Sequence, residues 1–277
     1  NSMPAESSIT PTGNELQGNI TDAAHAGTYI VSSNKEMLLG KVGNTTIYVK
    51  QGATLKLTNV FELQDNVTIY VMSGATLIDP TYDLASAGIT IYNYGTLQFT
   101  SNSKRIAPNQ YIYNYGDANW SNSTISNQGH LYVGGDFKAK AWGGWQGGGT
   151  LYVSGNFEYP NEDLAFDGNN YIGGKLSAKN ITFINSAKLY NECGVFATQE
   201  IKITGNNELH VAYLKAQKLE QSSNSNIYLK NNSFIETPNY VNHNAGVGSI
   251  TLEGDNAVAY IIGEKLHYNH SDGNRNN

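Results

Sequence analysis

The chain has 277 residues, of which 39% are hydrophobic and only 14% are charged, and its formal net charge is −6. This length allows one large domain or two smaller ones, and the sparse basic residues exclude a basic surface for nucleic acid or anionic lipid. No apolar run is long enough to span a membrane, and the single cysteine, Cys193, excludes an internal disulfide and a cluster of thiolate metal ligands.

The first 27 residues show little apolar periodicity and contain Pro4, Pro11, Gly13 and Gly18. We predict that residues 1–27 form an irregular lead-in. If the chain that follows is a stack of β-coils, the open end of the stack exposes core residues and unpaired backbone groups. The lead-in is then expected to act as a cap.

Residues 28–262 repeat a short pattern about every 20 to 22 positions. Each unit has an alternating stretch rich in Ile, Val, Thr and Tyr, then a small or polar pair, then a bulky apolar residue. Residues 46–49 precede Gly52, and residues 68–71 precede Gly74 in the same way. Such alternation is typical of short strands in which every second side chain points inward. The pattern weakens after Pro238, and residues 263–277 are predicted to be a polar C-terminal tail.

Two series of residues at constant offset are expected to form the core. The first series contains the bulky residues that follow the turns: Leu55, Leu77, Leu97, Ala118, Phe137, Phe157, Leu176, Phe196, Leu214 and Phe234. The second series lies about six residues earlier: Val49, Val71, Ile91, Ile112, Leu131, Leu151, Tyr190 and Tyr228. Asn170 falls at a position of the second series, so we expect a distorted coil there.

Asparagines recur beside the turns, as Asn93, Asn114 and Asn191. An Asn at one turn can hydrogen-bond its copies in the coils above and below. Together these patterns predict an all-β fold, a single-stranded, right-handed parallel β-helix (solenoid) of about ten coils with roughly 20–22 residues per coil.

One segment, residues 141–149, interrupts the repeat with two tryptophans among glycines. We predict a projecting turn on which Trp142, Trp145 and Gln146 form an aromatic platform for a sugar ring, with Trp120 and Tyr159 contributing if they lie on the same side. The alternative is that these tryptophans pack on neighbouring turns.

Acidic residues gather at Glu158, Glu162, Asp163 and Asp167 on one expected loop. The loop is either solvated or a calcium site formed by Glu162, Asp163 and Asp167, since hard cations bind several oxygens. Calcium is the only cofactor that the sequence suggests.

Two further groups of charged residues are expected to be exposed. Asp65, Asp79 and Asp83 form a looser acidic group with a solvated loop as its simplest explanation, and Lys104 with Arg105 is expected to be an exposed basic turn.

Glycoside hydrolysis needs two carboxylates about 5 to 9.5 Å apart. Two repeat positions were compared between successive coils, the one that holds Asp136 and the one that holds Glu158. Neither position carries a carboxylate in two successive coils. No catalytic residue is therefore predicted.

Three phrases of the repeat resemble a known family. They are residues 91–97 (IYNYGTL), residues 151–157 (LYVSGNF) and, most tellingly, residues 187–193 (AKLYNEC). They are similar to the β-helical part of LruC-domain surface proteins of Gram-negative bacteria, over roughly residues 45–262. The resemblance implies a secreted protein, or one anchored at the outer membrane by a lipid in the full-length protein, and it supplies no catalytic motif.

The function expected from the sequence is that of a non-catalytic β-helix, secreted or displayed on the outer-membrane surface. It would act as a stalk or an adhesin-like interaction module, with an extracellular glycan or a cell-surface protein as its partner. The alternative is a carbohydrate-binding or polysaccharide-cleaving β-helix of the pectin-lyase type. A groove with paired carboxylates or a calcium ion would favour the alternative.

Overall fold

Short parallel strands make up nearly all of the regular structure. A computed structural model describes residues 3–84, 88–143, 148–222, 224–242, 248–260 and, by their backbone alone, 265–268. The strands stack as an all-β solenoid of about 11 turns, where about ten were predicted from the sequence. The predicted parallel β-solenoid is confirmed, and its right-handed sense stays a prediction.

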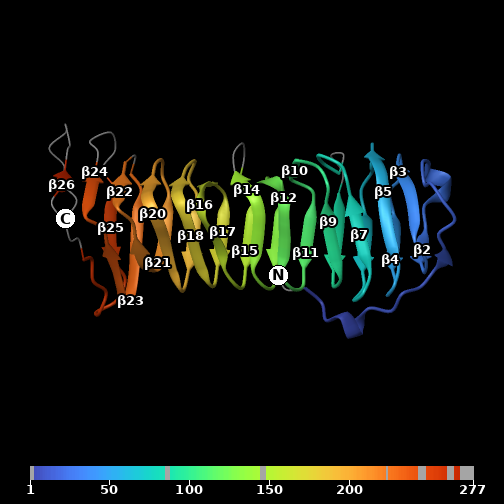
Figure 1. Cartoon of the computed structure of the whole chain (residues 1–277), viewed down its shortest axis with the longest axis horizontal. Helices are drawn as coiled ribbons and strands as arrows, with labels where there is room; N and C mark the ends of the chain where they lie inside the picture. The colour runs from blue at the N-terminus through green and yellow to red at the C-terminus, as the bar shows by residue number, and fades with distance from the viewer. Residues whose placement is uncertain are drawn as a thin grey trace. The chain divides into compact units, whose positions relative to one another are not determined.

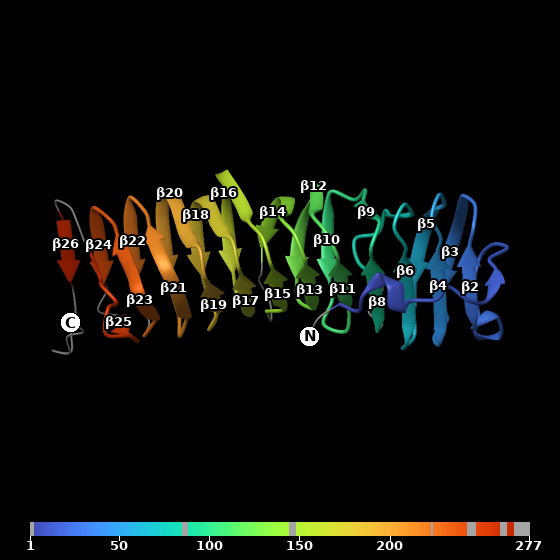
Figure 2. The ribbon, with the colours of Figure 1, turned by 90° about the horizontal axis from the view of Figure 1, so that it is seen from below.

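The chain forms two compact units, Asn1–Gly135 and Asp136–Asn277, called the first and second unit below. Within each unit, the strands of successive turns lie side by side (Figures 1 and 2). The elements of the first unit are η1 (Glu6–Ser8), β1 (Asn14–Glu15), η2 (Ala23–His25), β2 (Thr28–Val31), β3 (Lys35–Gly40), β4 (Thr45–Val49), β5 (Thr54–Phe61), β6 (Val67–Val71), β7 (Thr76–Asp79), β8 (Ile89–Asn93), β9 (Thr96–Phe99), β10 (Ser103–Ile106), β11 (Tyr111–Asn114), β12 (Ala118–Asn127) and β13 (His130–Val133).

The elements of the second unit are β14 (Phe137–Gly143), β15 (Thr150–Val153), β16 (Phe157–Phe166), β17 (Asn169–Ile172), β18 (Lys175–Phe183), β19 (Lys188–Asn191), β20 (Gly194–Ile203), β21 (Glu208–Lys215), β22 (Lys218–Gln221), β23 (Asn226–Glu236), β24 (Asn239–Asn242), β25 (Ser249–Leu252) and β26 (Lys265–Tyr268). Most strands pair with the strand two places on, which belongs to the next turn. The strand β26 pairs with β24 and lies inside the stretch predicted as a polar tail.

One face of the first unit consists of β1, β2, β4, β6, β8, β11 and β13, paired in parallel in that order. Another face consists of β3, β5, β7 and β9, and β10 pairs with β12. The register is regular: Ile47 pairs with Ile69, and Ile69 pairs with Ile91. Each of these three side chains is fully buried.

The turn length is less uniform than the predicted 20–22 residues. Ile47 and Ile69 are 22 positions apart, whereas Leu209 and its partner Ile227 in the second unit are 18 apart. The core tolerates this variation because insertions and deletions fall in the turns or at irregularities within strands, as in β16 between Tyr159 and Asp163. The inward positions on either side of these irregularities stay in register.

Four residues that were predicted to point inward point outward instead: Tyr190, Phe196, Tyr228 and Phe234. Leu176 pairs with Val195 and not with Phe196, and Leu214 pairs with Ile235 and not with Phe234. Phe234 is 38% exposed and Tyr190 is 43% exposed. The fully buried Leu189 and Ile227 fill the positions that had been assigned to Tyr190 and Tyr228. Because strand side chains alternate between faces, an offset of one residue in the predicted frame places the wrong residue in the core.

The coil of Asn170 is irregular in β16, where the register with β18 shifts between Tyr159 and Asp163, but Asn170 itself occupies the core position predicted for it. It lies in register between Leu151 and Leu189. Its side-chain Nδ2 donates to the carbonyl oxygens of Asp167 at 2.9 Å, Lys188 at 3.2 Å and Gly168 at 3.3 Å. These bonds satisfy the amide N–H groups, so a buried polar residue fits the regular strand β17.

The N-terminal segment has two parts. Leu16 and Ile20 are buried, and the bridge between Ile20 and Leu39 adds to the stack, while the role of a cap stays a prediction. The residues before β1 run back along the turns of the first unit, as the dark blue segment in Figures 1 and 2 shows. There the Glu6 carboxylate accepts hydrogen bonds from Ser73 N at 2.6 Å and Ser73 Oγ at 2.7 Å. We call residues 3–8 the N-terminal strap.

Candidate functional site

An outward column of tyrosines follows the first unit's strands β4, β6, β8 and β11. The rings of Tyr48, Tyr70, Tyr92 and Tyr113 stack with centroid distances of 4.9, 5.0 and 5.0 Å and interplanar angles of 9°, 12° and 10°. The column exists because each tyrosine follows an inward Ile in strict alternation and pairs with the next tyrosine in register. We call these four residues the tyrosine column.

The tyrosine column presents edges and hydroxyl groups, since the faces of its rings are turned toward one another. Thr46, Thr68 and Thr90 lie beside it, half-buried, two residues before Tyr48, Tyr70 and Tyr92. Burial, with the neighbouring tyrosines contributing less, raises the pKa of Tyr70. Its phenol is therefore neutral at physiological pH and acts both as a hydrogen-bond donor and as an acceptor.

The second unit continues the aromatic pattern at the equivalent strand positions. Tyr152 stacks on Tyr171 at 4.6 Å, and His210 lies between Tyr190 at 4.6 Å and Tyr228 at 4.5 Å. Carboxylates flank the imidazole: Nε2 lies 3.4 Å from Glu208 Oε2, and Nδ1 lies 3.4 Å from Glu253 Oε1. These contacts hold the ring at the centre of its stack.

The structure does not form the predicted aromatic platform from the residues that it describes. Trp120 is 3% exposed, donates from Nε1 to the Leu97 carbonyl oxygen at 2.9 Å, and packs on Phe99. Trp142 is 5% exposed. Both indoles are therefore packed against neighbouring parts of the fold, which agrees with the alternative. Burying the large apolar area of an indole stabilises the folded state. Trp145 and Gln146 lie outside the described residues.

Phenylalanines of the second unit surround Trp142. The indole meets Phe137 and Phe157 edge to face, at 5.5 and 5.6 Å, and contacts Phe166 at 6.1 Å. Its Nε1 has no hydrogen-bond partner among the described residues. Tyr159 is half-buried and packs against Phe157, and burial raises the pKa of its phenol. Both side chains therefore belong to the core of this unit.

The three predicted calcium ligands have different environments. Glu162 and Asp163 are exposed on β16, and Asp163 accepts a hydrogen bond from Asn180 Nδ2 at 2.8 Å. Asp167 is buried, 4% exposed, and among the described residues no side chain hydrogen-bonds its carboxylate oxygens. Across the described part of the chain, no three acidic, His or Cys side chains group closely enough to hold a metal ion. The structure thus does not gather these three residues into a calcium site.

A surface hollow of about 420 Å³ lies in the second unit, beside the outward-facing Phe196. Pro160, Thr198, Lys215 and Gln217 contribute to its lining. The sequence did not predict the hollow, because Phe196 had been assigned to the core. An aromatic wall with a few polar groups is the usual composition of a small-ligand site.

Two carboxyl groups do meet on adjacent turns, at Glu200 on β20 and Glu220 on β22. Burial, followed by a hydrogen bond with Glu220, raises the pKa of Glu200. Lys218 Nζ lies 3.8 Å from Glu200, and Lys202 Nζ lies 3.7 Å from Glu220. Carboxyl groups that share a hydrogen bond are closer than the separation of about 5 Å or more used in glycoside hydrolysis. The cluster is therefore a network of ion pairs between turns.

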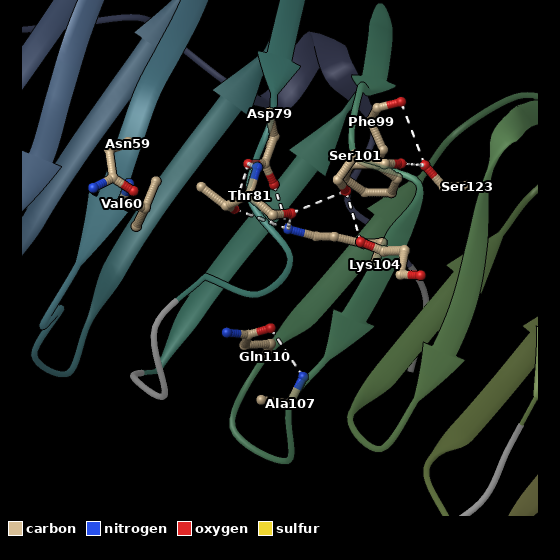
Figure 3. Close-up of polar contacts among 11 residues, drawn as sticks. Asn59, Val60, Asp79, Thr81, Phe99, Ser101, Lys104, Ala107, Gln110 and Ser123 are labelled. Atoms are coloured by element: carbon tan, nitrogen blue, oxygen red, sulfur yellow. Dashed lines mark hydrogen bonds and ion pairs between the residues drawn. The ribbon is translucent and has the colours of Figure 1, made fainter.

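The first unit buries a lysine and an aspartate where the pattern calls for apolar residues (Figure 3). Lys104 and Asp79 form an ion pair, and both side chains are completely buried. This corrects two sequence predictions, an exposed basic turn at Lys104 and a solvated loop at Asp79. Arg105 keeps a partly exposed position and pairs with Asp83 at 3.3 Å.

Comparison with models of known protein families gives no match, and neither does comparison with curated protein sequences or with solved structures. Among the described residues, no helix has the length and apolar character needed to cross a membrane.

Proposed function

We propose that the protein is a non-catalytic β-solenoid, displayed on the cell surface or secreted, that acts as a stalk or adhesin-like interaction module. The tyrosine column is the main support for this proposal. It holds four phenol groups at a spacing of about 5 Å on a backbone that parallel pairing makes rigid. Repeat proteins use such extended faces to bind partners.

The partner proposed is an extracellular glycan. With 14% charged residues, the chain has few charges to attract an ionic partner. Phenol and threonine hydroxyls both donate and accept hydrogen bonds, as sugar hydroxyls do. Because the ring faces of the column cover one another, the glycan would contact ring edges and hydroxyl groups. A surface protein as partner is the other outcome that a binding screen distinguishes.

The test is a binding screen of the full chain against glycans and cell-surface proteins, with the variants Tyr70→Phe and Tyr92→Phe. These keep the stacked rings and remove only the hydroxyls. We expect each to weaken glycan binding by about two- to ten-fold, the effect of losing one hydrogen bond. Tyr82→Phe is the matched control, since Tyr82 is 55% exposed and lies outside the column. Unchanged binding by both column variants would contradict the proposal.

The hollow beside Phe196 favours a second candidate, carbohydrate binding in the second unit. A sugar ring placed there would contact the aromatic side chain and reach Thr198, Lys215 or Gln217. In the same screen, Phe196→Ala would abolish this binding and leave binding to the column unchanged. Polysaccharide cleavage has less support, because the Glu200 and Glu220 carboxyls are too close together for it.

A further inference from the structure

Lys104 and Asp79 occupy core positions of the first unit. On β10, Lys104 pairs in register with Ile125, and on β7, Asp79 pairs with Phe99. Both partners are buried hydrophobic residues. Replacing apolar residues by an ion pair at such positions is costly, because both charges leave water. The pair therefore needs an explanation beyond the packing of the core.

The contacts give the two Asp79 oxygens different roles. Oδ1 accepts hydrogen bonds from Thr81 N at 2.9 Å and from Thr81 Oγ1 at 2.6 Å. Oδ2 accepts from Lys104 Nζ, which also lies 3.3 Å from both Thr81 O and Thr81 Oγ1. Figure 3 shows the lysine side chain extending toward Thr81 and Asp79. One oxygen is thus fixed by two donors, while the other faces the amine.

The surroundings favour the uncharged form of Lys104. Burial lowers the pKa of Lys104, against the opposing effects of Asp79 and, more weakly, Asp83. The Phe99 ring, whose centroid is 5.1 Å from Nζ, forms one wall. Transfer of one proton from the ammonium to the carboxylate removes both charges from a region of low dielectric constant and leaves a nucleophilic amine beside a carboxylic acid.

We propose that Lys104 and Asp79 condense to form an intramolecular isopeptide bond, which joins Nζ of the lysine to Cγ of the aspartate. The neutral amine attacks Cγ, and the carbonyl electron pair moves to Oδ1, where Thr81 N–H and Oγ1–H stabilise the negative charge. A proton then moves from Nζ to Oδ2, which is already protonated. The Cγ–Oδ2 bond breaks, water leaves, and the carbonyl re-forms as an amide.

The reaction consumes one amine and one carboxylic acid, and it yields one amide and one water molecule without an oxidant or a co-reactant. Two effects drive it. The fold holds the reacting groups in contact, which corresponds to an effective concentration of about 10⁵–10⁸ M in well-oriented systems. The amide also needs no buried charge, and the water that would reverse the reaction is excluded from the site.

The bond would connect β7 to β10, whose reacting residues are 25 positions apart. It would therefore link successive turns of the first unit covalently. A pulling force could not separate those turns without breaking a covalent bond, which suits a stalk. The inference is independent of glycan binding, since it involves neither the tyrosine column nor the hollow.

The decisive measurement is the mass of the full chain after denaturation. We expect a mass lower than that of the sequence by one water molecule, and a branched peptide that joins Asp79 to Lys104 after proteolysis. The branched peptide separates the isopeptide bond from a succinimide at another aspartate, which has the same mass. A chain with its full sequence mass and separate peptides for Asp79 and Lys104 would overturn the proposal.

Variants locate the reaction and test the role of Thr81. Lys104→Met should show its full sequence mass, whereas Lys218→Met should retain the loss of water, because Lys218 lies 3.8 Å from the partly exposed Glu200 in an ordinary ion pair. Thr81→Ala should slow bond formation by about 100-fold, the effect of removing one oxyanion donor, when the loss of water is followed with time after the chain is synthesised. Loss of water from Lys104→Met would refute the assignment. If that variant does not fold, the presence or absence of the branched peptide in the parent chain still shows whether Lys104 and Asp79 are joined.

Discussion

At the scale of single residues, Asp167 has the least favourable surroundings among the described carboxylates that were predicted to bind calcium. Both of its oxygens are buried, and no side chain in the described part of the chain hydrogen-bonds them. Burial raises its pKa above 3.8, and the nearby backbone N–H groups of Gly148 and Asp167 oppose this only in part. At neutral pH, the folded protein therefore holds either an unpaired buried charge or a tightly bound proton.

The raised pKa predicts how stability depends on pH. The folded state binds the proton of Asp167 more tightly than the unfolded state does. The resulting stabilisation is fully present below pH 3.8 and is lost as the pH rises through the folded-state pKa. We expect Asp167→Asn to raise the free energy of unfolding by about 1–3 kcal/mol at pH 7, because the neutral amide avoids the cost of burying a charged group. Denaturant titrations at several pH values measure this.

The gain should vanish well below pH 3.8, where Asp167 is protonated in both states. Glu162→Gln is the matched control, because Glu162 is exposed on the preceding strand. It should change stability little at any pH. A gain from Asp167→Asn that persists unchanged at acidic pH would show that the charge is not the cause.

At the scale of elements, the asparagine ladder connects neighbouring turns through side chains. Asn93 Nδ2 donates to Asn114 Oδ1 at 2.7 Å, and Asn93 Oδ1 accepts from Gly95 N at 3.1 Å. The same register position is Val71 in the preceding turn and Val133 in the following one. The chain itself thus supplies an apolar replacement of suitable shape.

The ladder predicts non-additive substitutions. Asn93→Val leaves a buried oxygen of Asn114 and the N–H of Gly95 unpaired, and it should lower the free energy of unfolding by about 1–3 kcal/mol. The double variant with Asn114→Val removes the unpaired oxygen, so it should be more stable than the sum of the single effects predicts. Chemical denaturation of the four proteins measures the coupling. Additive effects would mean that the two asparagines do not interact.

The sequence predicted the ladder because Asn93 and Asn114 repeat with the period of the coil. It also predicted the strands, since residues such as Ile69 and Val71 alternate with polar ones. The errors in assigning inward residues arose where either of two adjacent residues fitted the core. At Val195 and Phe196 both residues are apolar, and the larger one was placed inside, whereas the structure buries the valine. Size alone does not set the register of a strand.

The position of Lys104 was beyond prediction from the pattern. A lysine next to an arginine is normally solvated, and its only favourable core partner, Asp79, lies 25 residues away in a different turn. The tyrosine column could have been found, because Tyr48, Tyr70 and Tyr92 recur every 22 residues between inward positions. The signal was the tyrosine repeat itself, since each of these residues directly follows an Ile of the repeat.

At the scale of the whole molecule, a solenoid is stabilised by contacts between neighbouring turns, so its stability varies along the chain. In the second unit, β18 pairs with β16 on one side and β20 on the other, and most of its inward residues are fully buried. In β25, all four residues are half-buried or exposed. Local opening should therefore be easier at β25.

Hydrogen exchange tests this gradient. We expect the backbone amides of β18 to exchange at least about 100-fold more slowly than those of β25, since opening free energies range from near zero to the global value. Exchange followed by mass spectrometry of peptides from each strand measures the difference. Equal protection in both strands would instead indicate that the second unit opens as one cooperative block.

The N-terminal strap has a consequence for the order of folding. Contacts between turns join residues about one turn apart, so each new turn can add to the previous one as soon as it is made. The strap is different: Glu6 bonds Ser73 across 67 positions, and the Tyr94 hydroxyl donates to the Pro4 carbonyl oxygen across 90. During synthesis the strap leaves the ribosome before the turns that it binds, and its binding surface is complete only after Tyr94 has emerged. The strap is thus made before the turns of the first unit but reaches its final place after most of them.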